Sequence, residues 1–203
     1  MRNVCLKPGF RLHLIAAVVI MSLGHLGAQA ADLPKVKEIR LEKRGGVLSI
    51  AELEVFAGGK NIARDGKAEQ SSTAHGGLAG LAVDGNTEGN FFQKSVTHSD
   101  PGDPSPWWRL TFPEPRTVEE VEVWNRTEAE TERLDGVRLL FLDESGKILA
   151  GTVLTNVFPS VRYRFTGRYL VVAAPNLLAA PDTSFASVEG NPWRYRLHYD
   201  QPA

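Results

Sequence analysis

Short stretches in which apolar and charged residues alternate recur along this chain of 203 residues, and helical periodicity does not. Because successive side chains of a strand point to opposite faces, the alternation predicts strands with one buried face. It is found at residues 38–42, 52–55, 120–123, 161–165 and 193–199. Runs 137–142 and 169–173 indicate more fully buried strands, whereas 176–192 lacks a pattern and is expected to be a loop. Many short strands separated by Gly- and Asp-rich turns favour an antiparallel β-sandwich.

Residues 1–30 have the features of a secretory signal peptide. Arg2, Lys7 and Arg11 precede the apolar run 14–24, and Ala28-Gln29-Ala30 ends it with small residues, so we expect cleavage after Ala30. The alternative is an uncleaved membrane anchor, but the apolar run is short for a membrane span. We therefore expect export to the periplasm, the cell surface or the medium.

Cysteine content and charge restrict the chemistry of the mature chain. Cys5, the only cysteine, lies within the predicted signal peptide, which leaves neither a disulfide nor a thiolate site. Removal of residues 1–30 takes three of the 23 Lys and Arg residues and none of the 24 acidic residues, so the net charge becomes −4. This balance argues against nucleic acid or an anionic membrane as the main partner. The remaining residues, 31–203, fit one domain.

The loop 81–90 is rich in oxygen ligands. Asp84-Gly85 predicts a sharp turn, and Asn86 adds a side-chain or main-chain oxygen. Such a loop can fold its carbonyl groups around Ca²⁺, with Asp84 supplying negative charge. The alternative is an Asx-turn that only connects two elements.

His98, Arg126 and Arg133 follow this loop in the sequence. An imidazole and two guanidinium groups suit a ligand covered in hydroxyl groups, because they donate and accept hydrogen bonds in fixed directions. Each residue also has an ordinary interpretation. A lone histidine is more often a surface or core residue, and arginines among glutamates often form solvated ion pairs.

Other candidate functions are weaker. Trp107 and Trp108 are expected to fill the core rather than to stack on a sugar. The acidic residues Glu128, Glu130 and Glu132 could serve a glycosidase, but nothing indicates an apolar pocket that would raise a carboxyl pKa, so we do not expect an enzyme. The sequon beginning at Asn125 is discounted as a glycosylation site because Arg126 would be crowded.

Six pieces of the sequence, in this order, resemble the fucolectin-like branch of the discoidin, or coagulation-factor type C, domain family. They are GKNIARDGKAEQSST, LAVDGNTEGNFF, SVTH, PWWRLTF, WNRT and ERLDG, and the resemblance covers roughly residues 60–142. Each piece alone is weak, but the combination is specific. The resemblance implies a jelly-roll β-sandwich of about eight core strands that binds fucose-type sugars beside a structural Ca²⁺.

The resemblance also assigns roles to individual residues. His98, Arg126 and Arg133 match the sugar-binding residues, and Phe92 matches an aromatic position near the sugar. The calcium loop is matched by the carbonyl groups of Leu81 and Asn86 and by the side chains of Asp84 and Ser95.

Two departures from the family pattern lie between the arginines. Some members have adjacent cysteines where this chain has Ala129-Glu130, and Glu128 stands where an aspartate is usual. These changes bear on sugar specificity and affinity. They also support an alternative function, a protein-binding or adhesion module that has kept the sandwich without sugar binding.

The last calcium ligands of the family come from a C-terminal strand that has no close match here. The segment 47–56 resembles that strand instead, so we predict that it closes the calcium site with the Ala51 carbonyl and the Glu52 carboxylate. Glu52 must then lie near Asp84. The expected function is a secreted, calcium-dependent lectin for fucosylated or related glycans, in which strong adhesion requires several sites or an oligomer.

Overall fold

The computed structural model describes residues 33–173, which form ten strands and four short 3₁₀ helices. The strands are β1 Lys35–Glu42, β2 Glu52–Ala57, β3 Lys60–Asn61, β4 Lys67–Gln70, β5 Trp107–Thr117, β6 Glu120–Trp124, β7 Arg138–Leu142, β8 Ile148–Val153, β9 Ser160–Thr166 and β10 Tyr169–Val172. The helices are η2 Ala63–Asp65, η3 Ala79–Val83, η4 Phe91–Gln93 and η5 Thr131–Leu134. None of the helices in the described range is long and apolar enough to cross a membrane. The predicted signal peptide and the predicted strand 193–199 lie outside this range.

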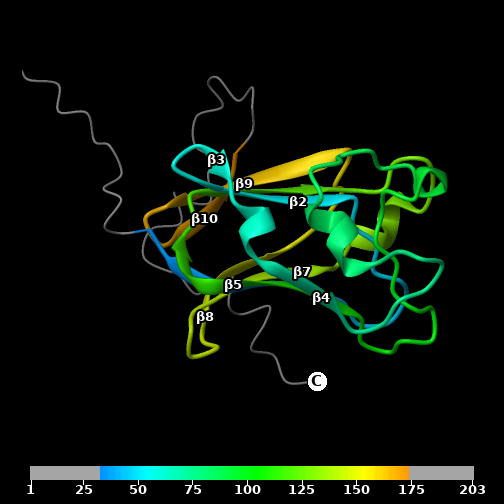
Figure 1. Ribbon diagram of the computed structural model, residues 1–203, viewed down its shortest axis with the longest axis horizontal. Helices are drawn as coiled ribbons and strands as arrows, with labels where there is room; N and C mark the ends of the chain where they lie inside the picture. The colour runs from blue at the N-terminus through cyan, green and yellow to red at the C-terminus, as the bar shows by residue number, and fades with distance from the viewer. Residues whose placement is uncertain (1–32, 174–203) are drawn as a thin grey trace, which may run out of the picture.

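The strands form two antiparallel five-stranded sheets, so the predicted all-β sandwich is confirmed (Figure 1). One sheet has the order β4-β5-β1-β7-β8, and the other has the order β10-β9-β6-β2-β3. In the first, Leu41 of β1 is paired with Trp108 of β5 and with Leu139 of β7. In the second, Val123 of β6 is paired with Leu53 of β2 and Val161 of β9.

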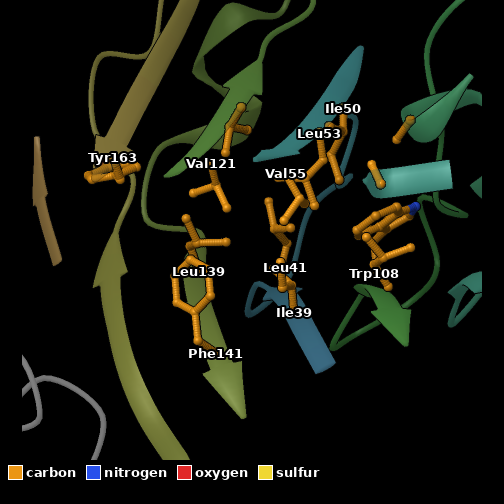
Figure 2. Packing of buried hydrophobic residues seen from close by; sticks show 14 of the residues in the cluster. Ile39, Leu41, Ile50, Leu53, Val55, Trp108, Val121, Leu139, Phe141 and Tyr163 are labelled. Atoms are coloured by element: carbon orange, nitrogen blue, oxygen red, sulfur yellow. The ribbon is translucent and has the colours of Figure 1, made fainter. Parts of the chain in front are cut away.

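The inward-facing residues of the two sheets meet in one hydrophobic core. Figure 2 shows Ile39, Leu41, Leu139 and Phe141 of one sheet pointing toward Leu53, Val55, Val121 and Tyr163 of the other. Most of these are apolar positions of the alternating pattern, while Leu139 and Phe141 come from the more fully buried run 137–142, and their removal from water is the main stabilising contribution. Strand β7 is buried over most of its length, as predicted.

Three expectations require correction. Strand β10 is not fully buried: Leu170 alone of its four residues is buried, because β10 is the edge strand of its sheet. Trp107 is only half-buried, with the guanidinium of Arg109 5.0 Å from its ring centre, while Trp108 occupies the core. The predicted strand 47–56 begins only at Glu52, and residues 48–50 instead bond to the segment 97–99.

Strand register places the site-bearing loops at one end of the sandwich. The end of β1 pairs with the starts of β5 and β7, through Glu42, Trp107 and Arg138. The start of β2 pairs with the end of β6, through Glu52 and Trp124. Segments that enter or leave these strand ends therefore share one end of the molecule. They form the green loops and short helices at the right of Figure 1.

Candidate functional site

His98 is the central residue of the site and is almost completely buried, with 4% of its surface exposed. Its Nδ1 lies 2.7 Å from the carbonyl oxygen of Ser99, so this nitrogen carries the proton and donates it. Its Nε2 lies 3.1 Å from Nη1 of Arg133, which can only donate. Both contacts require the same tautomer, a neutral imidazole with an accepting Nε2. Burial, reinforced by the charge of Arg133, lowers the pKa of His98 below its ordinary value, so the neutral form is favoured.

The backbone around His98 is closely packed. Gly77 accepts a hydrogen bond from the His98 amide through its carbonyl, at 3.0 Å. A Cβ atom at Gly77 would lie 2.4 Å from the His98 nitrogen, so glycine is required by the close approach of the two backbones. The residues before His98 are also fixed: Thr97 accepts a hydrogen bond from the Ile50 amide through its hydroxyl group.

Arg126 and Arg133, the two arginines selected from the sequence, lie in the connection between β6 and β7. Nε of Arg126 lies 2.6 Å from Oε1 of Glu128, and its guanidinium carbon lies 4.6 Å from the ring centre of Phe91. Burial opposes ionisation of Glu128, but the hydrogen bond from Arg126, the backbone hydrogen bonds and the charge of Arg126 together lower the pKa of this carboxyl group. Nη2 of Arg133 lies 3.4 Å from Oε2 of Glu130. The two arginines thus border His98 and each has a carboxylate partner.

Two aromatic residues that sequence reasoning did not select also contact this cluster. The ring of Phe91 lies 5.6 Å from that of His98, and the ring of His75 lies 4.9 Å from His98. Phe92, the aromatic residue selected from the sequence, is 76% exposed and contacts Phe91 with a ring distance of 5.7 Å. In the sequence, the adjacent phenylalanines Phe91 and Phe92 were the feature that could have indicated a second aromatic residue at this site. Which of the two rings lies over Arg126 depends on the turn of η4, which the sequence pattern does not specify.

The predicted cation loop lies beside Glu52. Oε1 of Glu52 accepts a hydrogen bond from the Gly85 amide at 2.9 Å, so Glu52 and Asp84 are neighbours as the prediction required. Glu52 is fully buried, and its Oε2 has no hydrogen-bond partner. Burial raises the pKa of Glu52 to about 7, and the nearby charges of Asp84 and Glu54 act in the same direction. This carboxylate therefore lacks a positive partner among the described residues.

The other predicted calcium ligands surround the same turn. Asp84 accepts a hydrogen bond from the Asn86 amide at 2.8 Å, which is the Asx-turn considered as the alternative. Leu81 lies in η3, and the hydroxyl group of Ser95 donates to the Asn90 carbonyl at 3.1 Å. Ala51 precedes β2 and bonds through its amide to Trp124. Residues 33–173 contain no group of three or more His, Cys, Asp or Glu side chains that could hold a metal, so a cation site here would also need oxygen donors of other kinds.

Asn125 holds the connection between β6 and β7 in place through its side chain. It is buried, and its side-chain amide donates to the carbonyl groups of Thr131 at 2.7 Å and Val157 at 2.8 Å. These bonds hold the connection that carries Arg126 and Arg133. They also engage both N–H groups of the amide within the protein, where it is buried.

Comparisons with known proteins identify relatives of this domain. Residues 81–170 match the model of the F5/F8 type C group described as the NedA-like, galactose-binding domain. Fucolectin-5 of Anguilla japonica is 37% identical over 86 residues, which cover 40% of this chain and 45% of that protein. Fucolectin of Anguilla anguilla is 36% identical over 85 residues, covering 39% of this chain and 53% of that protein. The chain therefore spans about half the length of the fucolectins it matches.

A solved structure resembles the same region. A mutant of the lectin binding domain of Lectinolysin, complexed with Lewis b, aligns with a TM-score of 0.50 and 34% identity. The match covers 56% of this chain and 80% of that domain. These relatives are lectins, which agrees with the expectation that this chain is not an enzyme.

Proposed function

The chain belongs to the fucolectin-like branch of the F5/F8 type C, or discoidin-like, domain family, and from this premise we propose that it binds fucose-type sugars with the support of Ca²⁺. The observation that carries the proposal is the arrangement of an accepting His98 Nε2 beside the donating guanidinium of Arg133. A sugar hydroxyl both donates and accepts, so it can bond to the two groups at once.

Each polar residue has a distinct part in the proposal. On binding, one sugar hydroxyl group would replace Nη1 of Arg133 as the donor to the single lone pair of His98 Nε2, and the free N–H groups of Arg126 and Arg133 would donate to neighbouring oxygens. The bond between Nδ1 and Ser99 keeps the imidazole in the accepting tautomer. Because these groups are largely held by partners before binding, little side-chain entropy is lost when the sugar enters.

Aromatic residues supply the apolar part of the site. A fucose-type sugar has a methyl group as well as hydroxyl groups, and exposed aromatic carbon suits such a mixed surface. Phe91 is held between Arg126 and His98, whereas Phe92 is free to contact the ligand from the solvent side. We assign the apolar contact to Phe92 and the support of Arg126 to Phe91.

The calcium half of the proposal depends on Glu52. A buried carboxylate with an unpaired oxygen is costly unless a cation or a proton compensates it, so this group fits a Ca²⁺ ligand. Asp84 and Ser95 would complete the side-chain donors, and Leu81, Asn86 and Ala51 would contribute carbonyl oxygens. When bound, the ion would neutralise Glu52 and Asp84 and hold the loop against β2.

The sandwich offers a route by which the cation site can support the sugar site. The segment leading to Glu52 bonds to the segment carrying His98: the Thr97 amide donates to the Ile50 carbonyl at 2.8 Å, and the Ser99 amide donates to that of Leu48 at 3.0 Å. Fixing Glu52 and Asp84 therefore restricts the backbone that presents His98. Ordering this backbone before binding lowers the cost of sugar recognition.

We also propose that the domain acts outside the cytoplasm after removal of residues 1–30, and that its partners are fucosylated or related glycans. A single site of this kind is expected to bind weakly, so firm adhesion would come from several copies on one glycan-bearing surface.

Glycan-array binding in calcium and in chelator tests the proposal. The intact protein should bind fucosylated glycans in calcium, and binding should be lost in chelator, in His98→Ala and in Arg126→Ala. Arg168→Ala is the control, because Arg168 is exposed in the turn between β9 and β10. If the calcium-loaded protein binds no glycan, the protein-binding module on the same sandwich becomes the better explanation.

A further inference from the structure

Each arginine of the site is paired with its own carboxylate. Arg126 is bound to Glu128 at 2.6 Å, and Arg133 is bound to Glu130 at 3.4 Å. Lowering of the His98 pKa keeps the imidazole neutral at pH 7. Two positive and two negative groups therefore surround an uncharged acceptor, and the site has no net charge.

Sites that bind anions are built differently. Sulfate and carboxylate groups are recognised by guanidinium groups whose charge and parallel N–H groups are available to the ligand. Here Glu128 occupies two donor nitrogens of Arg126, and Glu130 lies against the outer nitrogen of Arg133. A sugar hydroxyl can still use the remaining N–H groups, but an anion would also meet the two carboxylates.

The surrounding charges do not restore a positive field. Lys43 donates from Nζ to the Arg133 carbonyl at 2.8 Å, and its nearest opposite charges are those of Glu132 and Asp135. With these residues included, the connection 128–135 and its contacts carry more acidic than basic side chains. Glycans that approach Arg133 therefore encounter a neutral to acidic surface.

The two carboxylates differ in accessibility. The side chain of Glu128 is 17% exposed and lies beneath the site, where it orients Arg126. The side chain of Glu130 is 49% exposed at the N-terminal end of η5, so its charge is open to solvent beside Arg133. Glu130 also has a left-handed backbone, with φ 56°, which an L-residue with a long side chain rarely adopts.

We propose that Glu130 is a specificity-determining residue that limits the site to uncharged glycans by repelling sulfate or carboxylate groups near Arg133. The inference rests on the proposed sugar-binding function and extends it to the class of glycan accepted. The charged groups in question are those on the sugar next to the fucose. A charged group attached to the recognised hydroxyl itself would be excluded by its size alone.

Matched glycan pairs test this inference. The probes are a neutral fucosylated oligosaccharide and the same oligosaccharide with a sulfate on the galactose adjacent to the fucose. Binding is measured by calorimetry in calcium at low salt and again at 0.5 M salt, roughly where charge interactions over several ångströms are screened. The variants are Glu130→Gln, which keeps the shape of the side chain, and Glu130→Asn, which suits the left-handed backbone.

Glu144→Gln is the control, because it removes the same charge from the turn after β7, at the opposite end of that strand from η5. The wild type and Glu144→Gln should prefer the neutral glycan. Both Glu130 variants should bind the sulfated glycan roughly fivefold more tightly than the wild type at low salt, with a smaller gain at 0.5 M salt. Because Glu130 also contacts Arg133, the affinity of each variant for the neutral glycan serves as its own reference, and the ratio of sulfated to neutral affinity is compared with that of the wild type.

Two results would overturn the inference while leaving the sugar site intact: equal wild-type affinity for both glycans, or no gain for the sulfated glycan in either variant that still binds the neutral one. Absence of binding to both glycans by the wild type would instead overturn the proposed function. The two failures are therefore distinguishable in the same measurement.

Discussion

The imidazole of His98 accepts from the guanidinium of Arg133, with 3.1 Å between Nε2 and Nη1, although the two residues lie on separate loops. One loop enters β5 and the other connects β6 to β7, so the contact joins segments from both sheets. The geometry requires an unprotonated Nε2. Any change that places a proton there turns a hydrogen bond into the contact of two positive groups.

Sugar binding should therefore be lost on acidification. Burial lowers the pKa of His98 below the ordinary value of 6.5, so the neutral acceptor persists at pH 7 and is lost as the pH falls through this lowered pKa. Because only the neutral form accepts a hydrogen bond from the ligand, affinity should fall about tenfold per pH unit below that point. Calorimetric titration with a methyl fucoside, in saturating calcium, measures the profile.

The same protonation affects folding. The unfolded chain takes up this proton at an ordinary pKa and the folded protein only at a lower one, so the contribution of His98 to stability decreases as the pH falls from 6.5 to the folded value. His98→Gln keeps an accepting oxygen but cannot titrate, and any residual binding should be insensitive to pH in this range. Constant wild-type affinity down to pH 4.5 would contradict the assignment of the acceptor.

In the calcium-free protein, the contribution of Glu52 to stability should change with pH in the direction opposite to that of His98. The folded pKa is about 7 against an ordinary 4.5, so the folded protein binds more protons between these values. The contribution of Glu52 is fully present below pH 4.5 and is lost as the pH rises through 7, by at most about 1.4 kcal/mol per pH unit. Calcium requires the ionised carboxylate, so its affinity should increase over the same pH range.

Thermal unfolding in chelator and in calcium, for wild type and Glu52→Gln, measures this effect. The difference between the two proteins isolates Glu52 from the other titrating groups. Glu52→Gln should be less sensitive to pH in chelator and should gain little from calcium. Glu54→Gln is the control for loss of a nearby charge, because Glu54 lies on the same face of β2 but already accepts from Trp124 at 3.0 Å and is not one of the proposed ligands. Equal stabilisation of all three proteins by calcium would place the ion elsewhere.

Alternation predicted the sandwich because the period of two is a local property of each strand. Thus Ile39, Leu41, Leu53 and Val55 lie in the core, as their spacing indicated. The pattern fails where burial depends on distant neighbours. Val172 in β10 is 51% exposed because β10 is at a sheet edge, and strand order is not encoded in the apolar run itself.

The sequence identified most of the residues of the candidate site but not how they contact one another. The order of His98, Arg126 and Arg133 along the chain, together with the family motifs, selected residues that the fold brings together. His75 was not selected, since contacts between rings on different turns leave no spacing signal. The carboxylate partners were visible as a run of glutamates, but which arginine each would bind depends on the left-handed turn at Glu130.

Two adjacent tryptophans should differ in their contributions to stability. Trp108 is buried and donates from Nε1 to the Ala79 carbonyl at 2.9 Å, so Trp108→Phe removes that bond and leaves a cavity. We expect a loss of about 1–3 kcal/mol in the free energy of unfolding. Trp107→Phe keeps an aromatic ring beneath Arg109 and should cost less than about 1 kcal/mol. Urea unfolding followed by circular dichroism compares the variants, and equal losses would contradict the assignment of Trp108 to the core.

Gly77 and Gly80 provide a test of how tightly the backbone holds His98. A methyl group at Gly77 would lie 2.4 Å from the His98 nitrogen and 2.8 Å from the Thr97 carbonyl carbon, so the backbone must move. A methyl group at Gly80 meets nothing within 4 Å. Gly77→Ala should therefore lower stability by about 1–3 kcal/mol and displace the imidazole, whereas Gly80→Ala should change stability by less than about 1 kcal/mol.

The effect on binding separates displacement of His98 from general destabilisation. At a temperature where both variants are fully folded, Gly77→Ala should weaken binding of the methyl fucoside roughly tenfold, because a shift of about 1 Å at a hydrogen-bonding group removes much of its contact. Gly80→Ala should bind as the wild type does. If Gly77→Ala retains full affinity while folded, the position of His98 is not set by this backbone contact, and the hydrogen bonds to Ser99 and Arg133 must hold the ring by themselves.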